Sequence, residues 1–388
     1  MRRRPRETYG RGMEIETIIV GAGQTGLATA YELGRRGRPA LVVDAHARVG
    51  DQWRARYASL RLNSPAKYDG LPGMPFPAPP MSYPTGTEMA DYFEAYVERM
   101  GIAVRTSTPV RAVTRLGDGA FRVEAGDQAF TAANVVVATG SEHLPRVPAF
   151  ADDLDPGIRQ LHSAAYRGPH QLLPGPVLVV GAGQSGADLS LEVARAGHDT
   201  WLAGKEPGEI PVEFGSRRFR LALPVLWFLA NHVLTLRTPV GRRMQPKVRS
   251  TGAPLVRVKL AHLDAAGVHR VAARAIGARD GWPTLADGTV LDVRNVIWCT
   301  GFRRDFSFID APVVGPDGWP IDDRGVVPEV PGLYFVGLLF QSGFYSMLIG
   351  GAGRDAARVA AHITHRAGAT GEGSGLLPRL DSNQKPAG

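Results

Sequence analysis

Cysteine is nearly absent from this sequence, since its 388 residues include only one, Cys299. A single cysteine excludes a disulfide scaffold, and it excludes redox chemistry that needs a cysteine pair within one chain. The 47 glycines and 30 prolines follow no fixed period, which excludes a fibrous repeat protein. With 44% hydrophobic and 21% charged residues, the composition indicates a globular protein of two or three domains.

Long hydrophobic runs are also missing. The segment 221–236 is 16 residues without a charge, but Pro224, Asn231 and His232 interrupt it, and it is too short for a transmembrane segment. We expect a cap over the active site or a contact in a homodimer, and a weak contact with a membrane surface is the alternative. No signal-peptide pattern follows the N-terminal arginines, so the expected location is cytoplasmic.

Acidic residues are fewer than basic ones, 37 against 45, which gives a formal net charge of +8. Part of the excess lies in residues 1–12, where five arginines face only Glu7. Such a tail is typical of a solvated arm, so we expect no nucleic-acid partner. We also expect no metal site.

The strongest feature that is present is an internal repeat. The sequence Gly-Ala-Gly-Gln-Thr-Gly at 21–26 follows the apolar run 15–20, and Gly-Ala-Gly-Gln-Ser-Gly at 181–186 follows the run 177–180. The second copy lies 160 residues after the first. The candidate cofactor-binding residues of the two copies are Gly21, Gly23, Gln24 and Gly26, and Gly181, Gly183, Gln184, Ser185 and Gly186.

Each copy has the spacing of a dinucleotide-binding turn between a strand and a helix. The first glycine permits a tight bend, the second lets the backbone approach a pyrophosphate, and the third lets helix and strand pack closely. The helix then offers unpaired N–H groups and a favourable dipole to the phosphates. We expect these helices over about 25–35 and 185–195, ended by Gly37 and Gly197.

The residue after each second strand separates the two sites. Asp44 follows the first, and an acid there accepts hydrogen bonds from both ribose hydroxyls of an unphosphorylated adenosine, as in FAD or NAD. The corresponding position of the second copy is Gly204, followed by Lys205. Loss of the acid and gain of a cation indicate a ribose 2′-phosphate and hence NADPH, unless Lys205 is only a solvated loop lysine.

Further glycine signatures follow two other apolar strands. Ala138-Thr139-Gly140 and Cys299-Thr300-Gly301 are predicted to pass close to another segment or to a ligand. After the run 333–336, we expect a long amphipathic helix over 346–366 whose N-terminus points at a flavin carbonyl. Gln341 and Ser342 precede this helix and could reach the flavin edge.

Taken together, these residues resemble the flavin-containing monooxygenases with two dinucleotide-binding domains, a group that includes the plant YUCCA enzymes. The resemblance covers 14–366. It rests on the two glycine motifs in order and on segments between and after them: Gly-Asp-Gln-Trp at 50–53, Leu-Pro-Gly-Met-Pro-Phe-Pro at 71–77, Tyr-Pro-Thr at 83–85, Ala-Thr-Gly at 138–140 and Thr-Gly-Phe at 300–302.

The resemblance implies an α/β fold with two Rossmann-like domains, in which the NADPH domain is inserted into a discontinuous FAD domain. With the repeat, it predicts an FAD-binding domain over 13–158 and 294–366 and an NADPH-binding domain over 167–290. Residues 1–12 and 367–388 are expected to be flexible tails.

The resemblance also implies the chemistry. NADPH would reduce FAD, and O₂ would add at flavin C4a to give a hydroperoxide that oxygenates a small organic substrate at an N or S centre, or a 2-oxo acid. Asn63 takes the place of the family's Asn near C4a and is the candidate catalytic residue, or else a turn residue before Pro65. Gln52 and Trp53 would lie near the flavin.

One departure leaves other functions open. The family's F-x-G-x-x-x-H-x-x-x-F/Y motif keeps His162 and Tyr166, but Pro156 and Ile158 stand in its Phe and Gly positions, and the Baeyer–Villiger signature is absent. The role of His162 is therefore open, and a hydrogen-bonded linker histidine is one interpretation. An NADPH-dependent flavoprotein reductase or dehydrogenase without oxygen transfer, and a nucleotide-sensing regulatory protein without turnover, remain as alternatives.

Overall fold

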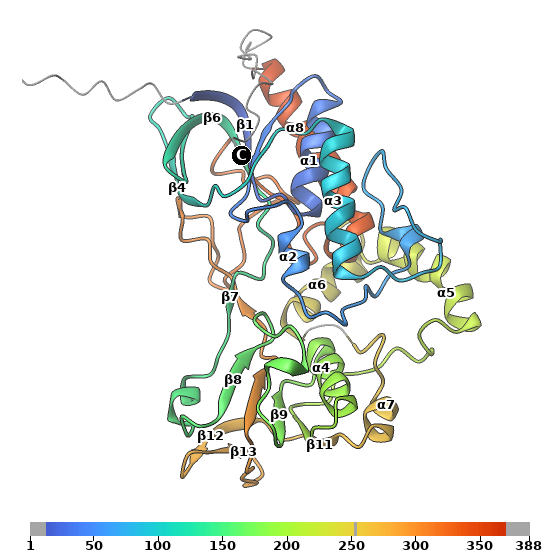
Figure 1. Cartoon of the computed structure of the whole chain (residues 1–388). Helices are drawn as coiled ribbons and strands as arrows, with labels where there is room; N and C mark the ends of the chain where they lie inside the picture. The colour runs from blue at the N-terminus through green and yellow to red at the C-terminus, as the bar shows by residue number, and fades with distance from the viewer. Residues whose placement is uncertain (1–12, 252–253, 370–388) are drawn as a thin grey trace, which may run out of the picture.

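The computed structural model describes residues 13–251 and 254–369. Two α/β lobes lie one above the other in Figure 1, and the chain passes between them twice. No helix of these ranges is long and apolar enough to cross a bilayer.

The first lobe is built on a mixed eight-stranded sheet. Its strands run β16-β4-β5-β6-β1-β2-β3, and β17 pairs with the end of β6 beyond the part that β5 covers. The strand bounds are β1 Met13–Val20, β2 Leu41–Val43, β3 Val104–Arg105, β4 Val110–Arg115, β5 Phe121–Ala125, β6 Gln128–Val137, β16 Ile309–Asp310 and β17 Leu333–Phe335.

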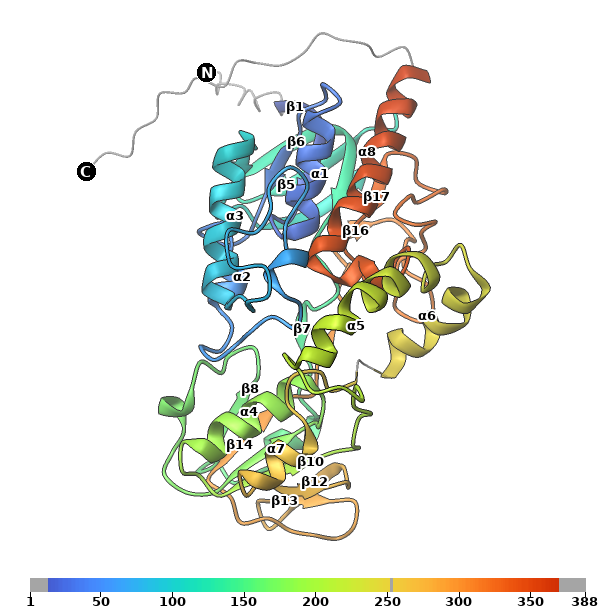
Figure 2. The same cartoon turned by 90° about the vertical axis from the view of Figure 1, so that its right-hand side faces the viewer.

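Helices α1, α3 and α8 cover one face of this sheet, and α8 lies along α1 in both views (Figures 1 and 2). Alternation along β1 explains the two-sided core: Ile19 packs on the helical side, and Ile18 and Val20 pack on the other. The helix bounds are α1 Gln24–Gly34, α2 Asp51–Arg54, α3 Gly86–Met100 and α8 Ala352–Ala369.

The second lobe contains a five-stranded parallel sheet in the order β11-β10-β9-β14-β8. Hairpin β12–β13 and helices α4 and α7 complete it, and α5, the π-helical turn η4 and α6 form an insertion. The bounds are β8 Arg159–His162, β9 Val177–Val180, α4 Gln184–Arg195, β10 Thr200–Ala203, α5 Arg217–Phe228, η4 Leu229–Val233, α6 Pro239–Thr251, α7 Leu260–Ala265, β11 His269–Val271, β12 Ala275–Arg279, β13 Trp282–Leu285 and β14 Asn295–Trp298.

The predicted α/β class with two Rossmann-like sheets is confirmed. The sequence limits of the second sheet are wider than the predicted range 167–290, because β8 and β14 pair within it. The chain crosses from the first lobe to the second before β8, and it crosses back after β14. Each of these strands therefore lies next to a crossing. The domain limits themselves remain a proposal.

Two expected helix boundaries are wrong. Residues 346–351 are not α-helical: they fall in the 3₁₀ turns η5 Phe344–Met347 and η6 Ile349–Gly351, and the α-helix begins at Ala352. Leu348 between the turns is extended, and a Cβ on Gly350 would lie 2.0 Å from the Tyr68 carbonyl oxygen. The helix also continues to Ala369, into the predicted tail, while 1–12 and 370–388 lie outside the described residues.

The insertion formed by α5, η4 and α6 packs back onto the first lobe (Figure 2). Leu236 N–H donates to the Ser342 carbonyl and Phe344 N–H to the Leu234 carbonyl, both within 2.9 Å. Trp227 stacks on Tyr68 with ring centroids 4.5 Å apart. The segment therefore covers the chain that leads into α8, while the apolar side chains on its outer face, such as Leu221, stay exposed.

Candidate functional site

The two glycine turns have nearly the same backbone geometry. Gly21 and Gly181 both have φ of 108°, in the region that favours glycine. A Cβ on Gly26 would lie 2.0 Å from the carbonyl oxygen of Gly21, and a Cβ on Gly186 would lie 1.8 Å from that of Gly181. In both copies the third glycine therefore lets the helix sit directly against the turn.

The middle glycine of each turn leaves open space. A Cβ on Gly183 would meet nothing within 4 Å, and one on Gly23 would meet only the Gln52 amide nitrogen at 3.7 Å. These two glycines are the N-caps of α4 and α1, and no side chain caps either helix. Open space beside uncapped N–H groups at a helix N-terminus fits the pyrophosphate of a dinucleotide.

The two later glycine signatures lie directly behind the turns. A Cβ on Gly21 would lie 2.8 Å from the Ala138 carbonyl oxygen, and one on Gly181 would lie 2.4 Å from that of Cys299. Thr139 and Gly140 continue into the first crossing between the lobes, and Thr300 and Gly301 continue into the second.

Burial raises the pKa of the Cys299 thiol to about 12, so the thiol stays protonated near neutral pH.

Asp44 is buried at the end of β2. Its Oδ2 accepts the backbone N–H of Ala22 at 2.7 Å, and its Oδ1 accepts the backbone N–H of His46 at 2.8 Å. The carboxylate is thus fixed beside the first glycine turn, where the sequence predicts a ribose ligand. This role remains a proposal.

An acid at the corresponding position of the second lobe would be strained. Gly204 follows β10 with φ of 147°, and a Cβ there would lie 3.0 Å from the Ala182 backbone nitrogen. Lys205 is exposed beside the second turn, and its neighbour Glu206 pairs with Arg270. The second lobe therefore has Gly204 at the position of Asp44, followed by an exposed cation.

Asn63 connects the two halves of the candidate site. It is exposed, and its amide Nδ2 donates to Gln184 Oε1 at 2.6 Å, although 121 residues separate the two along the chain. The Gln184 amide in turn donates to the Pro254 carbonyl at 3.1 Å. The predicted catalytic residue thus lies beside the second glycine turn, and its catalytic role remains a proposal.

The remaining candidates divide between the site and the interior. Gln52 and Trp53 lie in α2, partly exposed, and Gln52 faces Gly23. Gln341 and Ser342 are buried, and the Gln341 amide donates to Asp322 Oδ2 at 3.0 Å and to the Phe335 carbonyl at 2.9 Å. Gln341 thus supports the fold directly, and its reach to a flavin remains a prediction.

The crossings between the lobes are fixed by two histidines. His162 accepts the Ala164 N–H on Nδ1, so its Nε2–H donates to the Gly301 carbonyl at 3.0 Å. His143 accepts the Asp305 N–H on Nδ1, and its Nε2–H donates to the Gly140 carbonyl at 3.0 Å. The interpretation of His162 as a hydrogen-bonded linker residue agrees with this geometry, and sequence reasoning missed His143.

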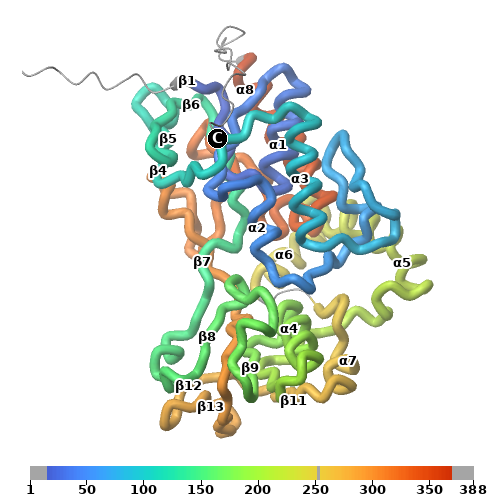
Figure 3. The backbone as a smooth tube through the Cα atoms, viewed as in Figure 1, coloured from blue at the N-terminus to red at the C-terminus, as the bar shows by residue number. Residues whose placement is uncertain are grey.

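The crossings also pair with each other. Strand β7 (Leu144–Pro145) runs antiparallel to β15 (Phe302–Arg303) at the waist of the molecule (Figure 3).

Burial lowers the pKa of His162, so its ring stays neutral at pH 7 and keeps its Nε2–H as the donor to the Gly301 carbonyl.

A buried polar contact also joins the lobes. The Tyr57 hydroxyl donates to Asp188 Oδ2 at 2.9 Å, and Arg257 pairs with the same carboxylate oxygen at 2.6 Å. Tyr57 follows α2 in the first lobe, whereas Asp188 lies on α4 behind the second glycine turn. Tyr57 also packs in the apolar core of the second lobe. This contact orients α4, and sequence reasoning did not identify it.

Comparison with known proteins gives consistent relatives. The model of the pyridine nucleotide-disulphide oxidoreductase family matches residues 18–210. The chain is 34% identical to an uncharacterized CzcO-like oxidoreductase of Geobacillus kaustophilus, over 88% of this chain and 96% of the relative. It is 31% identical to the indole-3-pyruvate monooxygenase YUCCA1 of Oryza sativa subsp. japonica, over 86% and 87%.

Among solved structures, the flavin-containing monooxygenase of Stenotrophomonas maltophilia superposes with a TM-score of 0.69 at 26% identity. The match covers 92% of this chain and 99% of that one.

Proposed function

The chain belongs to the flavin monooxygenase family, and from this premise we propose that it binds FAD at the first glycine turn and NADPH at the second. As a member of this family it is an oxidoreductase that uses a flavin. We further propose that it oxygenates a small organic substrate with O₂ through a flavin C4a-hydroperoxide.

The observation that carries the proposal is the difference between two otherwise matched sites. Both turns offer the same open approach to a pyrophosphate, but Asp44 stands at the ribose position of the first and Gly204-Lys205 at that of the second. An acid binds free ribose hydroxyls, and a cation without an acid suits a 2′-phosphate. Two different dinucleotides in one chain imply electron transfer between them.

The flavin, when bound, supplies the redox chemistry and the activation of O₂. The protein itself binds and orients the two cofactors and the substrate. The N-termini of α1 and α4 hold the two pyrophosphates, and Asp44 and Lys205 select the riboses. Asn63 lies at the junction, where its amide can donate to an oxygen atom near the flavin, while the insertion that packs on 339–344 helps to exclude water.

Two substrate classes fit this proposal. The rice relative is named for a 2-oxo acid, indole-3-pyruvate, which supports a 2-oxo acid as one class. An N or S centre is the other, because soft nucleophiles also accept an oxygen atom from such a flavin.

Stopped-flow absorbance of the NADPH-reduced, FAD-loaded protein mixed with O₂ tests the function. We expect NADPH to bleach the flavin and a long-lived oxygenated flavin band to form before reoxidation. Immediate reoxidation with release of one H₂O₂ per NADPH would instead identify a reductase or oxidase. Absence of bleaching by NADPH would favour a nucleotide-sensing protein without turnover.

A further inference from the structure

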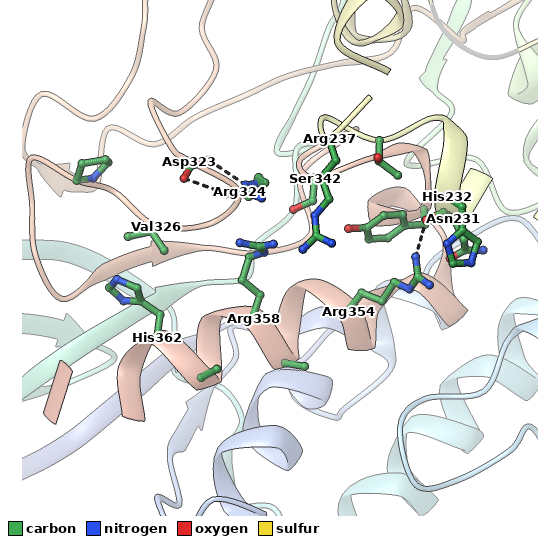
Figure 4. Close-up of a pocket in the computed structure, with 15 residues that line it drawn as sticks. Asn231, His232, Arg237, Asp323, Arg324, Val326, Ser342, Arg354, Arg358 and His362 are labelled. Atoms are coloured by element: carbon green, nitrogen blue, oxygen red, sulfur yellow. Dashed lines mark hydrogen bonds and ion pairs between the residues drawn. The ribbon is translucent and has the colours of Figure 1, made fainter. Parts of the chain in front are cut away.

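A groove of about 950 Å³ lies on the outer side of α8, away from both glycine turns. It is formed by α8, by Ser342 and Tyr345 ahead of α8, by the chain from η4 to Arg237, and by the stretch from Asp323 to Pro328 with its tight turn (Figure 4). Four arginines line it, namely Arg237, Arg324, Arg354 and Arg358. The volume is within the range of small-molecule sites.

Nearby carboxylates balance the positive charge of the groove only in part. Arg324 forms an ion pair with Asp323, in which the Arg324 Nε lies 3.0 Å from the Asp323 Oδ1. Arg354 donates to the backbone carbonyl of Asn231 at 2.6 Å, and no carboxylate of the described residues lies at ion-pair distance from it. Within 13–251 and 254–369, no carboxylate lies at ion-pair distance from Arg237 or Arg358.

Like charges also face one another across the groove. Arg358 points from α8 toward Arg324 and Arg237, which lie across the groove in Figure 4. Burial lowers the pKa of Arg358, and the charges of Arg324 and Arg237 lower it further. Two carboxylates act in the opposite sense: Asp355, buried on the same helix, raises the pKa of Arg358, and Asp323, which is already paired with Arg324, also interacts with the Arg358 charge. Four guanidinium groups beside two carboxylates leave a net positive charge, and a bound anion would offset it.

The turn that carries Arg324 is strained. Arg324 has φ of 50°, unusual for a residue other than glycine, and Asp322 accepts the Gly325 N–H at 2.6 Å to hold the turn closed. Strain of this kind persists where the surroundings fix it and is frequent at ligand sites. Here it holds a guanidinium over the groove.

We propose that this groove is a binding site for a phosphoryl group. Guanidinium forks match phosphate oxygens, and several of them suit a dianion better than a single carboxylate. Val326, Ala357 and Ala361 line the groove beside the charges and would accommodate an apolar part of the ligand. The phosphoryl group comes from a free phosphorylated compound or from a lipid headgroup, since the exposed apolar face of α5, with Leu221 and Val225, lies on the neighbouring insertion.

Titration calorimetry with inorganic pyrophosphate tests the site. The FAD-loaded protein is kept in saturating NADP⁺, so that both glycine turns are filled, and ionic strength is held constant. We expect saturable binding that weakens at least ~10-fold in Arg358→Gln and in Arg237→Gln, because each substitution removes a charge-assisted contact. The control Arg243→Gln removes one exposed charge of α6 outside the groove and should bind as the wild type does.

Thermal unfolding gives a second measurement. Without ligand, Arg358→Gln should unfold at the same or a higher temperature than the wild type, because a repelling charge is removed. Arg237 is exposed, so Arg237→Gln keeps the test valid if Arg358→Gln fails to fold.

Vesicle sedimentation separates the two sources. Binding to phosphatidylglycerol but not phosphatidylcholine vesicles, lost in Arg237→Gln and competed by pyrophosphate, supports a lipid headgroup. Pyrophosphate binding without vesicle binding supports a free phosphorylated compound. No saturable binding of either probe, or equal binding by wild type and both groove variants, overturns the proposal. Because binding is measured without turnover, failure here leaves the proposed oxygenation untouched.

Discussion

Single residues choose between the two proposed cofactors. The turns are alike in backbone, so a side chain must tell a free ribose from a phosphorylated one. Gly204 explains why the second lobe has no acid, since a Cβ there would press on the Ala182 backbone nitrogen. With the acid gone, the exposed amine of Lys205 is free of a competing carboxylate at that position.

Lys205→Ala should raise the NADPH KM about 10-fold, the lower end of the range for a charge-assisted bond, because the exposed amine is screened by water. NADH, without the 2′-phosphate, should be used as before. Steady-state reduction of the flavin with both cofactors measures the effect, and Lys205→Arg should keep the NADPH preference. An equal loss with both cofactors would show that Lys205 does not contact the 2′-phosphate.

Asn63→Ala should leave flavin reduction by NADPH close to the wild type and raise H₂O₂ release several-fold at the expense of product, because a donor near the activated oxygen is lost. The matched variant Gln184→Ala removes the partner of Asn63 but keeps the Asn63 amide. Peroxide per NADPH, normalised to bound FAD, separates the two. Equal peroxide release by both variants would assign Asn63 a positioning role through Gln184.

The glycine turns act at the scale of the strand–turn–helix element, and their glycines have different tasks. Gly186→Ala should destabilise the protein by about 1–3 kcal/mol, because its Cβ would overlap the Gly181 carbonyl and the backbone must move. Gly183→Ala should change stability by less than about 0.5 kcal/mol, because open space surrounds the position, yet it should raise the NADPH KM by crowding the pyrophosphate.

Thermal unfolding and NADPH kinetics of these two variants form the measurement. An unchanged NADPH KM in Gly183→Ala would mean that the open space beside Gly183 is not a ligand site, and a stability loss as large as in Gly186→Ala would mean that the space is not open. Gly23→Ala is the counterpart in the first lobe and should lower FAD retention instead of NADPH affinity.

At the scale of the whole molecule, the proposed reaction requires the two lobes to hold a fixed relation. The paired crossings β7 and β15 and the contact of Tyr57 with Asp188 provide it. Tyr57→Phe should lower the free energy of unfolding by about 1 kcal/mol and raise hydrogen exchange at 55–60, because one buried hydrogen bond between lobes is lost.

Tyr96→Phe is the control for this prediction, because it removes the hydrogen bond to the Pro72 carbonyl at 2.7 Å, which lies within the first lobe. It should cost similar stability without faster exchange at 55–60. The same exchange in both variants would show that Tyr57 does not join the lobes.

The sequence by itself determined the two glycine turns, the α/β class, the order of the lobes and the Asp44–Lys205 difference. These features are local, since a positive φ, a close backbone approach and an apolar strand are each encoded within a few residues. The residue at which α8 begins could not be predicted from the sequence, because the Tyr68 carbonyl that approaches Gly350 comes from a distant segment.

Only the tertiary structure decided the contacts that complete the sites. Asn63 meets Gln184 across 121 residues, His143 and His162 brace crossings that the chain order alone does not bring together, and three separate segments supply the arginines of the groove. No local pattern marks such residues, because their partners are fixed by the packing of the two lobes and the insertion. Local stereochemistry encoded the two glycine turns, and long-range packing set which residues of the two lobes meet.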